Sequence, residues 1–194
     1  MTIEGYGAFD DPCVYKGTTI LKNRLGIRTQ GTLDEFEVEM STLRAEEPLP
    51  DGRFDTAHYR KVHRHLFQDV YRWAGRYRTV RIAKGQNVFC YPEHIAAQMD
   101  SLFSQLSHGE FLKAEGFPLF AERAASFLGN LNAIHPFREG NGRTQLSFLG
   151  LLAAHVGHPL RLDRIKQETL LPAMVASFSN HLEPLIHELT ALRA

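Results

Sequence analysis

The run LSFLGLLAAHV, residues 146–156, constrains the fold more than any other stretch, because it is apolar on nearly all sides. A helix of this composition has no face that suits water, so other elements must enclose it. We therefore expect residues 146–156 to form a buried central helix. Residues 117–134 also show helical periodicity, with apolar side chains recurring on one face: Phe120, Ala124, Phe127, Leu131 and Ile134.

Other segments carry the same helical spacing or helix boundary signals. They predict helices from residue 33 to the EPLPDG stretch at 47–52, and over 56–74, 93–107, 163–178 and 182–192. Thr32 is expected to cap the first of these, with Glu35 completing a capping box. Gly75 is expected to stop the second. A short helix is also expected near residues 20–25.

The segment YRTVRIAKGQNVFCY, residues 77–91, breaks the helical pattern. Its residues alternate, and many are β-branched or aromatic, which predicts a small β-hairpin around KGQN. The predicted fold class is therefore all-α with one small β-hairpin. We expect an irregular N-terminal arm over residues 1–30, rich in Gly, Pro and Asp, and a single globular domain over residues 31–194.

The composition argues against several classes of partner. Lys and Arg together number 22, as do Asp and Glu, so the formal net charge is zero. Proteins that bind nucleic acids or anionic membranes usually have a basic surface, so we expect neither as a partner. No stretch reaches the ~20 apolar residues that span a bilayer, and no signal-peptide pattern is present. The 2 cysteines suit a reducing compartment, and we expect a cytoplasmic protein.

The run HPFREGNGRTQL, residues 135–146, gathers the groups that can carry chemistry. Gly140, Asn141 and Gly142 stand just before the central helix, where unpaired backbone N–H groups and the helix dipole favour an anion. Glycines also let the backbone approach a ligand closely, which suits a phosphate. Arg143 follows at the rim, where its forked donors can clamp a phosphate.

The same loop can supply a base and a metal ligand. His135 can act as a general base near neutral pH. Glu139 is a hard oxygen ligand, and one carboxylate beside phosphates commonly holds Mg²⁺. Phe137 would anchor the loop in the core. Each residue alone also has a structural explanation, but their conjunction indicates a site in which a hydroxyl attacks phosphorus.

Residues 135–143, HPFREGNGR, resemble the Fic (filamentation induced by cAMP) motif, HxFx(D/E)GNGRxxR. Residues 11–27, DPCVYKGTTILKNRLGI, resemble the N-terminal arm of Fic domains, and residues 63–85 resemble the helix and hairpin before the motif. The resemblance implies the Fic fold, a helical bundle with a β-hairpin flap. It also implies transfer of AMP from ATP, with Mg²⁺, to a Ser, Thr or Tyr hydroxyl of a target protein.

The resemblance also assigns roles to residues. His135 would be the base, Glu139 the Mg²⁺ ligand and residues 140–143 the phosphate cradle. The hairpin would be a flap that registers the target's backbone by adding a strand, through these residues: Val80, Arg81, Ile82, Val88 and Phe89. Lys84 and Gly85 at its tip would approach the nucleotide, although Lys84 could equally be a solvated turn residue.

Leu146 departs from the motif, which has a second arginine at this position. In the family that arginine contacts the terminal phosphate and pairs with an inhibitory glutamate. A charge-assisted bond of this kind is worth ~1.5–3 kcal/mol, so the terminal phosphate would bind more weakly. A Fic-fold transferase that uses another nucleotide or donor is therefore one alternative, and an inactive nucleotide-binding module is another. Leu146 also has a structural explanation, as an extension of the apolar stripe of Leu149 and Ala153.

The inhibitory pattern (S/T)xxxE(G/N) of many Fic proteins is absent from the sequence. Two explanations stay open. Either a small antitoxin supplies the inhibitory helix in trans, as in toxin–antitoxin pairs, or the protein is not controlled in this way. The resemblance is to stand-alone bacterial toxin-type members, and it is compatible with a homodimer.

Four other polar residues near these motifs receive no catalytic role. His63 and His65 are two positions apart on an expected helix, so their side chains point away from each other. We interpret both as ordinary helix residues rather than as a metal site. Arg138 and Gln145 flank the site, and no function is assigned to either of them.

Overall fold

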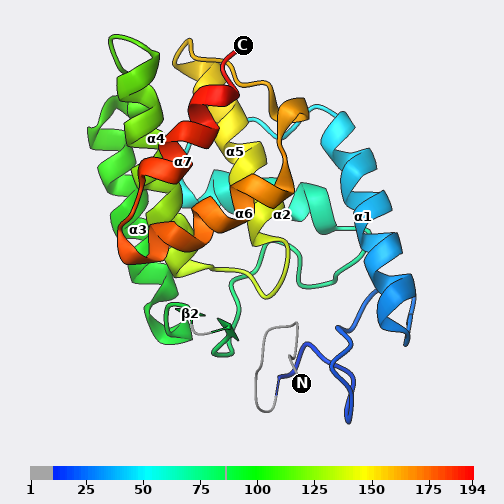
Figure 1. The fold of residues 1–194 in the computed structure, drawn as a ribbon. Helices are drawn as coiled ribbons and strands as arrows, with labels where there is room; N and C mark the ends of the chain where they lie inside the picture. Colours follow the sequence, from blue (N-terminus) through cyan, green and yellow to red (C-terminus); the bar gives the residue numbers. More distant parts are fainter. Residues whose placement is uncertain (1–10, 86) are drawn as a thin grey trace.

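The computed structural model describes residues 11–85 and 87–194, so the first ten residues of the expected arm lie outside it. The described residues form seven α-helices, three short 3-10 helices and one pair of antiparallel strands, which confirms the all-α class with a small hairpin (Figure 1). The α-helices and strands are α1 (Gln30–Glu46), α2 (Thr56–Phe67), β1 (Ala83–Lys84), β2 (Asn87–Val88), α3 (Pro92–His108), α4 (Phe117–Ile134), α5 (Asn141–His155), α6 (Gln167–Ala176) and α7 (Glu183–Ala191).

Helices α4 and α5 organise the packing. Helix α4 contacts α3, α5 and α7, and α6 packs on α7. Helix α5 contacts α2, which in turn contacts α1. Figure 1 shows α5 between α1 at one edge of the molecule and α3 at the other. The loop of residues 135–140 connects the two central helices and is therefore held by the most buried part of the fold.

The predicted central helix is correct in position but begins earlier. Helix α5 starts at Asn141, because Gly140 has φ +81° and ends the preceding loop. One face is fully enclosed, with Phe148, Leu149 and Leu152 at 0% exposure. The opposite side is less buried than the composition suggests, and Ala154 is exposed. A small side chain exposes little apolar surface, so this position costs little.

Three predictions near the N-terminus are wrong. Helix α1 begins after Thr29, so Thr32 lies inside it, and no side-chain hydrogen bond caps the helix. The short helix expected near residues 20–25 is absent from this described part of the chain. The side chain of Asn23 instead bonds the backbone N–H of Ile27 at 2.8 Å and the carbonyls of Leu21 and Ile27, and these bonds fix a loop.

The second helix and the C-terminal helix at 163–178 are both shorter than predicted. Helix α2 ends at Phe67, and successive turns follow, in which Tyr71 N–H bonds the carbonyl of Phe67 at 2.9 Å. The expected stop at Gly75 has φ +79°, but it closes these turns rather than the helix. Residues 163–178 divide into the 3-10 helix 162–164, α6 and the 3-10 helix 177–179.

The hairpin is also shorter than the predicted segment 77–91. Its register pairs Ala83 with Val88 and Lys84 with Asn87. One more bond continues the hairpin, from the Phe89 N–H to the Ile82 carbonyl at 3.3 Å, but residues further out bond the loop at 135–140 and the end of α4. Arg78 N–H donates to the Pro136 carbonyl at 2.9 Å, and Cys90 N–H donates to the Ala133 carbonyl at 3.1 Å. The flap, residues 80–90, is thus attached directly to the start of the loop.

No helix in the described residues is long and apolar enough to cross a membrane. This finding agrees with the absence of long apolar runs in the sequence. The packed helices instead enclose one contiguous apolar core, to which α2, α3, α4 and α5 contribute most of the buried side chains.

Candidate active site

A cavity of about 790 Å³ opens between the loop, the flap and α6. It collects most of the residues that the sequence singled out for base, metal and phosphate roles, and these come from segments far apart in the chain. These are Lys84, Gly85, His135, Glu139, Gly140, Gly142 and Arg143. Its other wall is apolar and includes Leu146, Leu170 and Met174. The cavity therefore joins a polar half to an apolar half.

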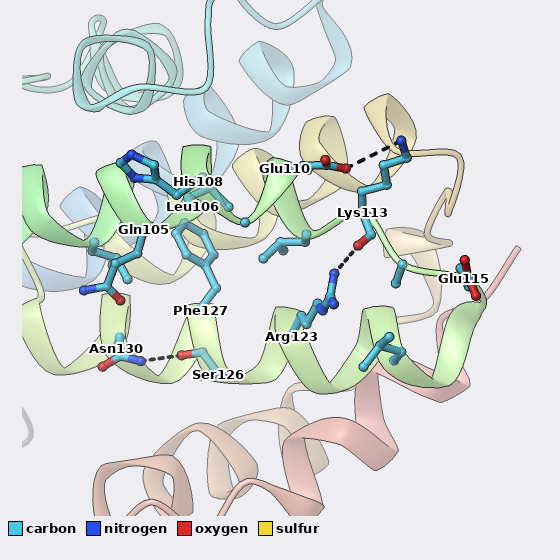
Figure 2. Close-up of a pocket in the computed structure, with 15 residues that line it drawn as sticks. Gln105, Leu106, His108, Glu110, Lys113, Glu115, Arg123, Ser126, Phe127 and Asn130 are labelled. Atoms are coloured by element: carbon cyan, nitrogen blue, oxygen red, sulfur yellow. Dashed lines mark hydrogen bonds and ion pairs between the residues drawn. The ribbon is translucent and has the colours of Figure 1, made fainter.

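A larger cavity of about 920 Å³ lies elsewhere, between α3, α4 and the 3-10 helix Glu110–Leu112 (Figure 2). Several of its polar side chains bond neighbours on its own rim. Lys113 pairs with Glu110 at 3.6 Å, and Asn130 donates to the Ser126 carbonyl at 2.8 Å. None of the predicted site residues lines it. Size alone therefore does not identify the site, and the chemistry points to the cavity beside His135.

His135 ends α4 in a left-handed conformation, with φ 48° and ψ 63°. Its Nδ1 lies 3.2 Å from the Asn132 carbonyl. Because a carbonyl only accepts, Nδ1 carries the proton and Nε2 carries the lone pair. The pKa of His135 is lowered to about 3, chiefly by burial and also by the charges of Arg78 and Lys84, while the Asn132 bond opposes these effects. The ring is therefore neutral near pH 7 and can accept a proton.

The flap contacts the histidine ring directly. Phe89 stacks on His135 with ring centroids 3.8 Å apart and planes at 20°. Phe89 and Ile82, both predicted to dock a target, are buried, whereas Arg81 and Val88 are exposed and Val80 is half-buried. The buried members face the protein, and the exposed members are the ones that a bound segment could reach.

Phe137 is fully buried, as its predicted anchoring role requires. Its ring lies 3.7 Å from the His63 ring and 5.5 Å from the Tyr59 ring, centroid to centroid. Asn141 bonds both backbone groups of Phe137: its Oδ1 accepts from the N–H at 2.9 Å and its Nδ2 donates to the carbonyl at 2.8 Å. The Asn141 side chain therefore closes the loop, and its backbone N–H is the group that lies at the start of α5.

Of the two glycines in the predicted phosphate cradle, the structure requires glycine only at position 140. Gly140 has φ +81°, and a Cβ added there would lie 2.4 Å from ring carbons of Phe67. Only glycine satisfies both conditions. Gly142 is exposed, lies within α5, and has no atom within 4 Å of an added Cβ. Gly142 therefore leaves open space over the first turn of α5, where a ligand can approach.

Glu139 lines the cavity, and its Oε1 accepts the Gly140 N–H at 2.8 Å. Burial raises the pKa of its carboxyl group, and the nearby Glu37 raises it further, while the Gly140 bond and the charges of Arg143 and Arg138 lower it. A cation beside Glu139 would relieve both unfavourable effects. The described residues contain no cluster of three or more metal-ligating side chains, so a metal here would need oxygens from a ligand or water.

Arg143 is held by helix α1. Its guanidinium donates to the Glu37 carboxylate and to Ser41 Oγ, the latter at 2.7 Å. Its Cζ lies 4.7 Å from the centre of the Phe67 ring. The side chain is still 37% exposed. The predicted clamp thus lies at the cavity in a fixed orientation, with donors that a phosphate could still reach.

Sequence reasoning missed two residues that position the loop. His63 Nε2 donates to the Glu139 carbonyl at 2.9 Å, while its Nδ1 accepts the Gly75 N–H at 2.9 Å. His63 occupies the apolar stripe of α2 together with Tyr59 and Leu66, and that spacing could have revealed its burial. Arg78 is 4% exposed and bonds carbonyls of both the loop and the flap.

Leu146, Gln145 and Arg138 complete the description of the loop's end. Leu146 is partly buried and belongs to the apolar wall of the cavity. Gln145 also lines the cavity, and its buried Nε2 has no hydrogen-bond partner among the described residues. Arg138 faces away into a buried ion pair with Asp11.

Comparisons with known proteins show which family and fold the chain resembles. Residues 53–153 match the Fic/DOC family. The chain is 50% identical over 185 residues to the "Probable protein adenylyltransferase y4lH" of Sinorhizobium fredii, and the match covers 95% of this chain and 96% of that protein. It is 36% identical over 167 residues to the "Probable protein adenylyltransferase Fic" of Escherichia coli, covering 84% of this chain and 82% of that protein.

The fold is similar to that of solved structures. The BepC protein of Bartonella tribocorum, a VirB-translocated effector solved with bound AMPPNP, superposes with a TM-score of 0.83 at 27% sequence identity. The superposition covers 94% of this chain and 96% of that chain.

Proposed function

Because this chain belongs to the Fic/DOC family, we propose that it is a protein adenylyltransferase. It transfers AMP from ATP to a Ser, Thr or Tyr hydroxyl of a target protein. One observation carries the proposal: a neutral, buried His135 faces the same cavity as the N-terminal turn of α5. A base and an anion site in one cavity are what attack of a hydroxyl on a phosphate requires. The names of the relatives and the nucleotide bound to BepC support it.

In this mechanism His135 Nε2 accepts the proton of the target hydroxyl. The hydroxyl oxygen forms a bond to the α-phosphorus of ATP, and the bond from that phosphorus to pyrophosphate breaks. AMP is then joined to the target, pyrophosphate leaves, and the proton stays on His135. The Nδ1 bond to the Asn132 carbonyl fixes the tautomer that this step needs.

The phosphates of ATP bind at the start of α5 in this proposal. The backbone N–H groups of Asn141 and Gly142 have no partners within the helix there and carry the positive end of its dipole. Gly140, whose N–H donates to Glu139, lets the chain turn into this position. Arg143 and Lys84 add positive charge from α5 and the flap. The exposed Arg143 donors reach the phosphates while Glu37 keeps the side chain at the cavity.

Glu139 would hold Mg²⁺. The donor set fits this ion, because a single carboxylate at a cavity large enough for phosphates and water is a common Mg²⁺ arrangement. The raised pKa of Glu139 indicates that its negative charge lacks full compensation in the protein. A bound Mg²⁺ would neutralise charge on the phosphates and on the carboxylate. Glu139 itself keeps its orientation through the Gly140 N–H and the His63 bond to its carbonyl.

A second candidate is a transferase that uses another donor. Leu146 favours it, because this residue lies on an apolar wall with Leu170 and Leu171, where the motif has an arginine. A donor with a shorter or less charged leaving group than pyrophosphate would suit this wall.

The flap edge is where we propose that the target docks. Residues 83–84 and 87–88 form only two pairs, and Arg81 and Val88 are exposed. An extended target segment could add a strand there. Control by an antitoxin in trans, a homodimer, a toxin role and a cytoplasmic location stay predictions from the sequence, as does the division at residue 30.

Intact-protein mass spectrometry tests the proposal. The purified protein is incubated with Mg²⁺ and each ribonucleoside triphosphate, alone and with cell lysate, beside His135→Ala and the exposed control His187→Ala. We expect a gain of one AMP on a protein that requires ATP and His135 and is unchanged by His187→Ala. A gain that matches another nucleotide would support the second candidate. ATP binding without any transfer would contradict catalysis.

A further inference from the structure

Arg78 connects the flap to the catalytic loop through one guanidinium. Nε donates to the His135 carbonyl at 2.8 Å and Nη1 to the Val80 carbonyl at 2.7 Å. Nη2 donates to the Cys90 carbonyl at 2.5 Å and to the Ile134 carbonyl at 3.2 Å. Val80 and Cys90 are the two ends of the flap, and Ile134 and His135 begin the loop. The four acceptors thus come from two segments separated by more than forty positions.

The backbone carbonyls at the junction of α4 and the loop need a hydrogen-bond donor. The last carbonyls of a helix have no partners within it, and α4 ends at Ile134. His135 adopts φ 48°, which an ordinary side chain rarely does, so surrounding contacts must hold it there. Arg78 satisfies the carbonyls on both sides of this turn, and its own N–H bonds the next carbonyl, that of Pro136. Three successive carbonyls of the turn therefore bond one residue.

An arginine suits this role better than any other side chain. A guanidinium has five N–H donors in a rigid planar fork, whereas a lysine ammonium is a single point with three donors. Only the fork can bond carbonyls on two sides at fixed angles. A lysine at position 78 would keep the charge but lose most of the connections.

The consequence is visible in the contact between the flap and the base. Phe89 of the flap stacks on the His135 ring at 3.8 Å. The stack holds only if the flap and the loop keep their relative position, and Arg78 bonds both of them. Cys90, whose carbonyl Arg78 binds, is the residue next to Phe89.

We propose that Arg78 is a positioning residue that aligns the flap with the catalytic base, so that a target segment docked on the flap presents its hydroxyl to His135. The proposal rests on the proposed function for its effect on transfer, but its geometric part is independent of activity. Arg78 acts through the backbone of the loop and the flap.

The first test is the position of the His135 ring in solution. Phe89 lies over the ring and shifts its protons upfield in the NMR spectrum, and these signals are identified by their loss in His135→Ala. We expect Arg78→Lys and Arg78→Gln to move the signals towards their positions in Phe89→Leu. The matched control is Arg60→Lys. Arg60 also bonds a backbone carbonyl, that of Gly75 at 2.9 Å. None of its contacts with the described residues reaches the loop or the flap, so its replacement should leave the signals in place.

The second test separates nucleotide binding from transfer. We expect Arg78→Lys and Arg78→Gln to bind ATP within about threefold of the parent affinity in calorimetry, but to transfer AMP at least tenfold more slowly. Unchanged His135 signals in folded Arg78→Gln would overturn the proposal. An equal loss of ATP binding and transfer would also overturn it, because it would indicate general damage. If Arg78→Gln fails to fold, Arg78→Lys decides. If the parent protein transfers no AMP, the proposed function fails, while the NMR comparison still tests the alignment.

Discussion

Arg143 of the motif donates to the carboxylate of Glu37, which lies 106 positions earlier in helix α1. The same carboxylate accepts a hydrogen bond from the Tyr71 hydroxyl. It also raises the pKa of Glu139. One acidic residue outside the motif therefore acts on both the cationic clamp and the proposed metal ligand, and it places negative charge beside a site that we propose binds phosphates.

Replacing Glu37 by Gln should strengthen ATP binding. The change keeps groups that can hydrogen-bond Arg143 and Tyr71 but removes a negative charge close to the phosphate site. We expect the Kd for ATP to fall by about three- to tenfold. Because Glu37 is buried, salt should screen this effect only weakly. Glu35→Gln, on the exposed part of the same helix, is the control. Unchanged or weaker ATP binding in calorimetry would show that Glu37 assists the clamp.

Gly140→Ala should destabilise the protein, whereas Gly142→Ala should not. A Cβ at residue 140 meets the Phe67 ring at 2.4 Å, and φ there is +81°. The left-handed conformation costs about 1–2 kcal/mol for an L-residue, and overpacking adds about 1–3 kcal/mol. We expect urea denaturation to show a loss of about 3 kcal/mol for Gly140→Ala and a change within about 0.5 kcal/mol for Gly142→Ala. Equal effects would mean that the loop relaxes around the added methyl group.

His63 should make stability depend on pH. Burial lowers its pKa from 6.5 to about 3 in the folded protein. Below about pH 6.5 the unfolded chain binds a proton that the folded chain does not. The contribution of His63 to the free energy of unfolding is therefore fully present above that pH and is lost as the pH drops towards 3. The slope is about 1.4 kcal/mol per pH unit for one histidine.

The matching variant is His63→Gln, which keeps a hydrogen-bonding side chain without the titration. Between pH 6.5 and 5 we expect the free energy of unfolding to fall by about 2 kcal/mol more in the parent than in His63→Gln. His135, also buried, titrates in both proteins and cancels in this comparison. Parallel pH profiles of denaturant unfolding would show that His63 takes up its proton in the folded state.

Leu146→Arg should restore a contact with the terminal phosphate. Leu146 lies one turn beyond Arg143 on α5 and lines the cavity. A charge-assisted hydrogen bond is worth about 1.5–3 kcal/mol, so ATP should bind at least tenfold more tightly, with a smaller gain for AMP. Leu146→Gln separates the effect of charge from that of lost apolar contacts. An equal gain for AMP and ATP would place the new guanidinium away from the terminal phosphate.

The helices of this fold were largely predictable, because local signals mark their ends. The predicted helix over residues 117–134 matches α4 at both ends. Gly116 has φ +133° before it, and Pro118 lies in its first turn, where proline is favoured. Helix α2 was predicted too long because apolar spacing continues through Val70 and Trp73. Those side chains pack in successive turns instead, and spacing alone does not distinguish the two cases.

The contacts that position the site were not predictable. The motif indicates which residues carry chemistry, and most of them line one cavity. Its partners Glu37, His63 and Arg78 come from other parts of the chain. Their bonds to the loop depend on how α1, α2 and the flap pack, which no local pattern records. The stacking of Phe89 on His135 is of the same kind, since an alternating strand pattern leaves open which face of the flap meets the base.

The buried ion pair between Asp11 and Arg138 joins positions 127 apart. It fastens the arm to the residue beside Glu139, in the middle of the loop at 135–140. Shortened forms that start after Asp11, and proteolytic removal of the arm, would leave the Arg138 charge without its carboxylate inside the protein. Such forms would disturb the loop from a distance, although every residue of the motif would be intact. An affinity tag for purification should therefore be added upstream of Asp11 and should not replace the residues of the arm.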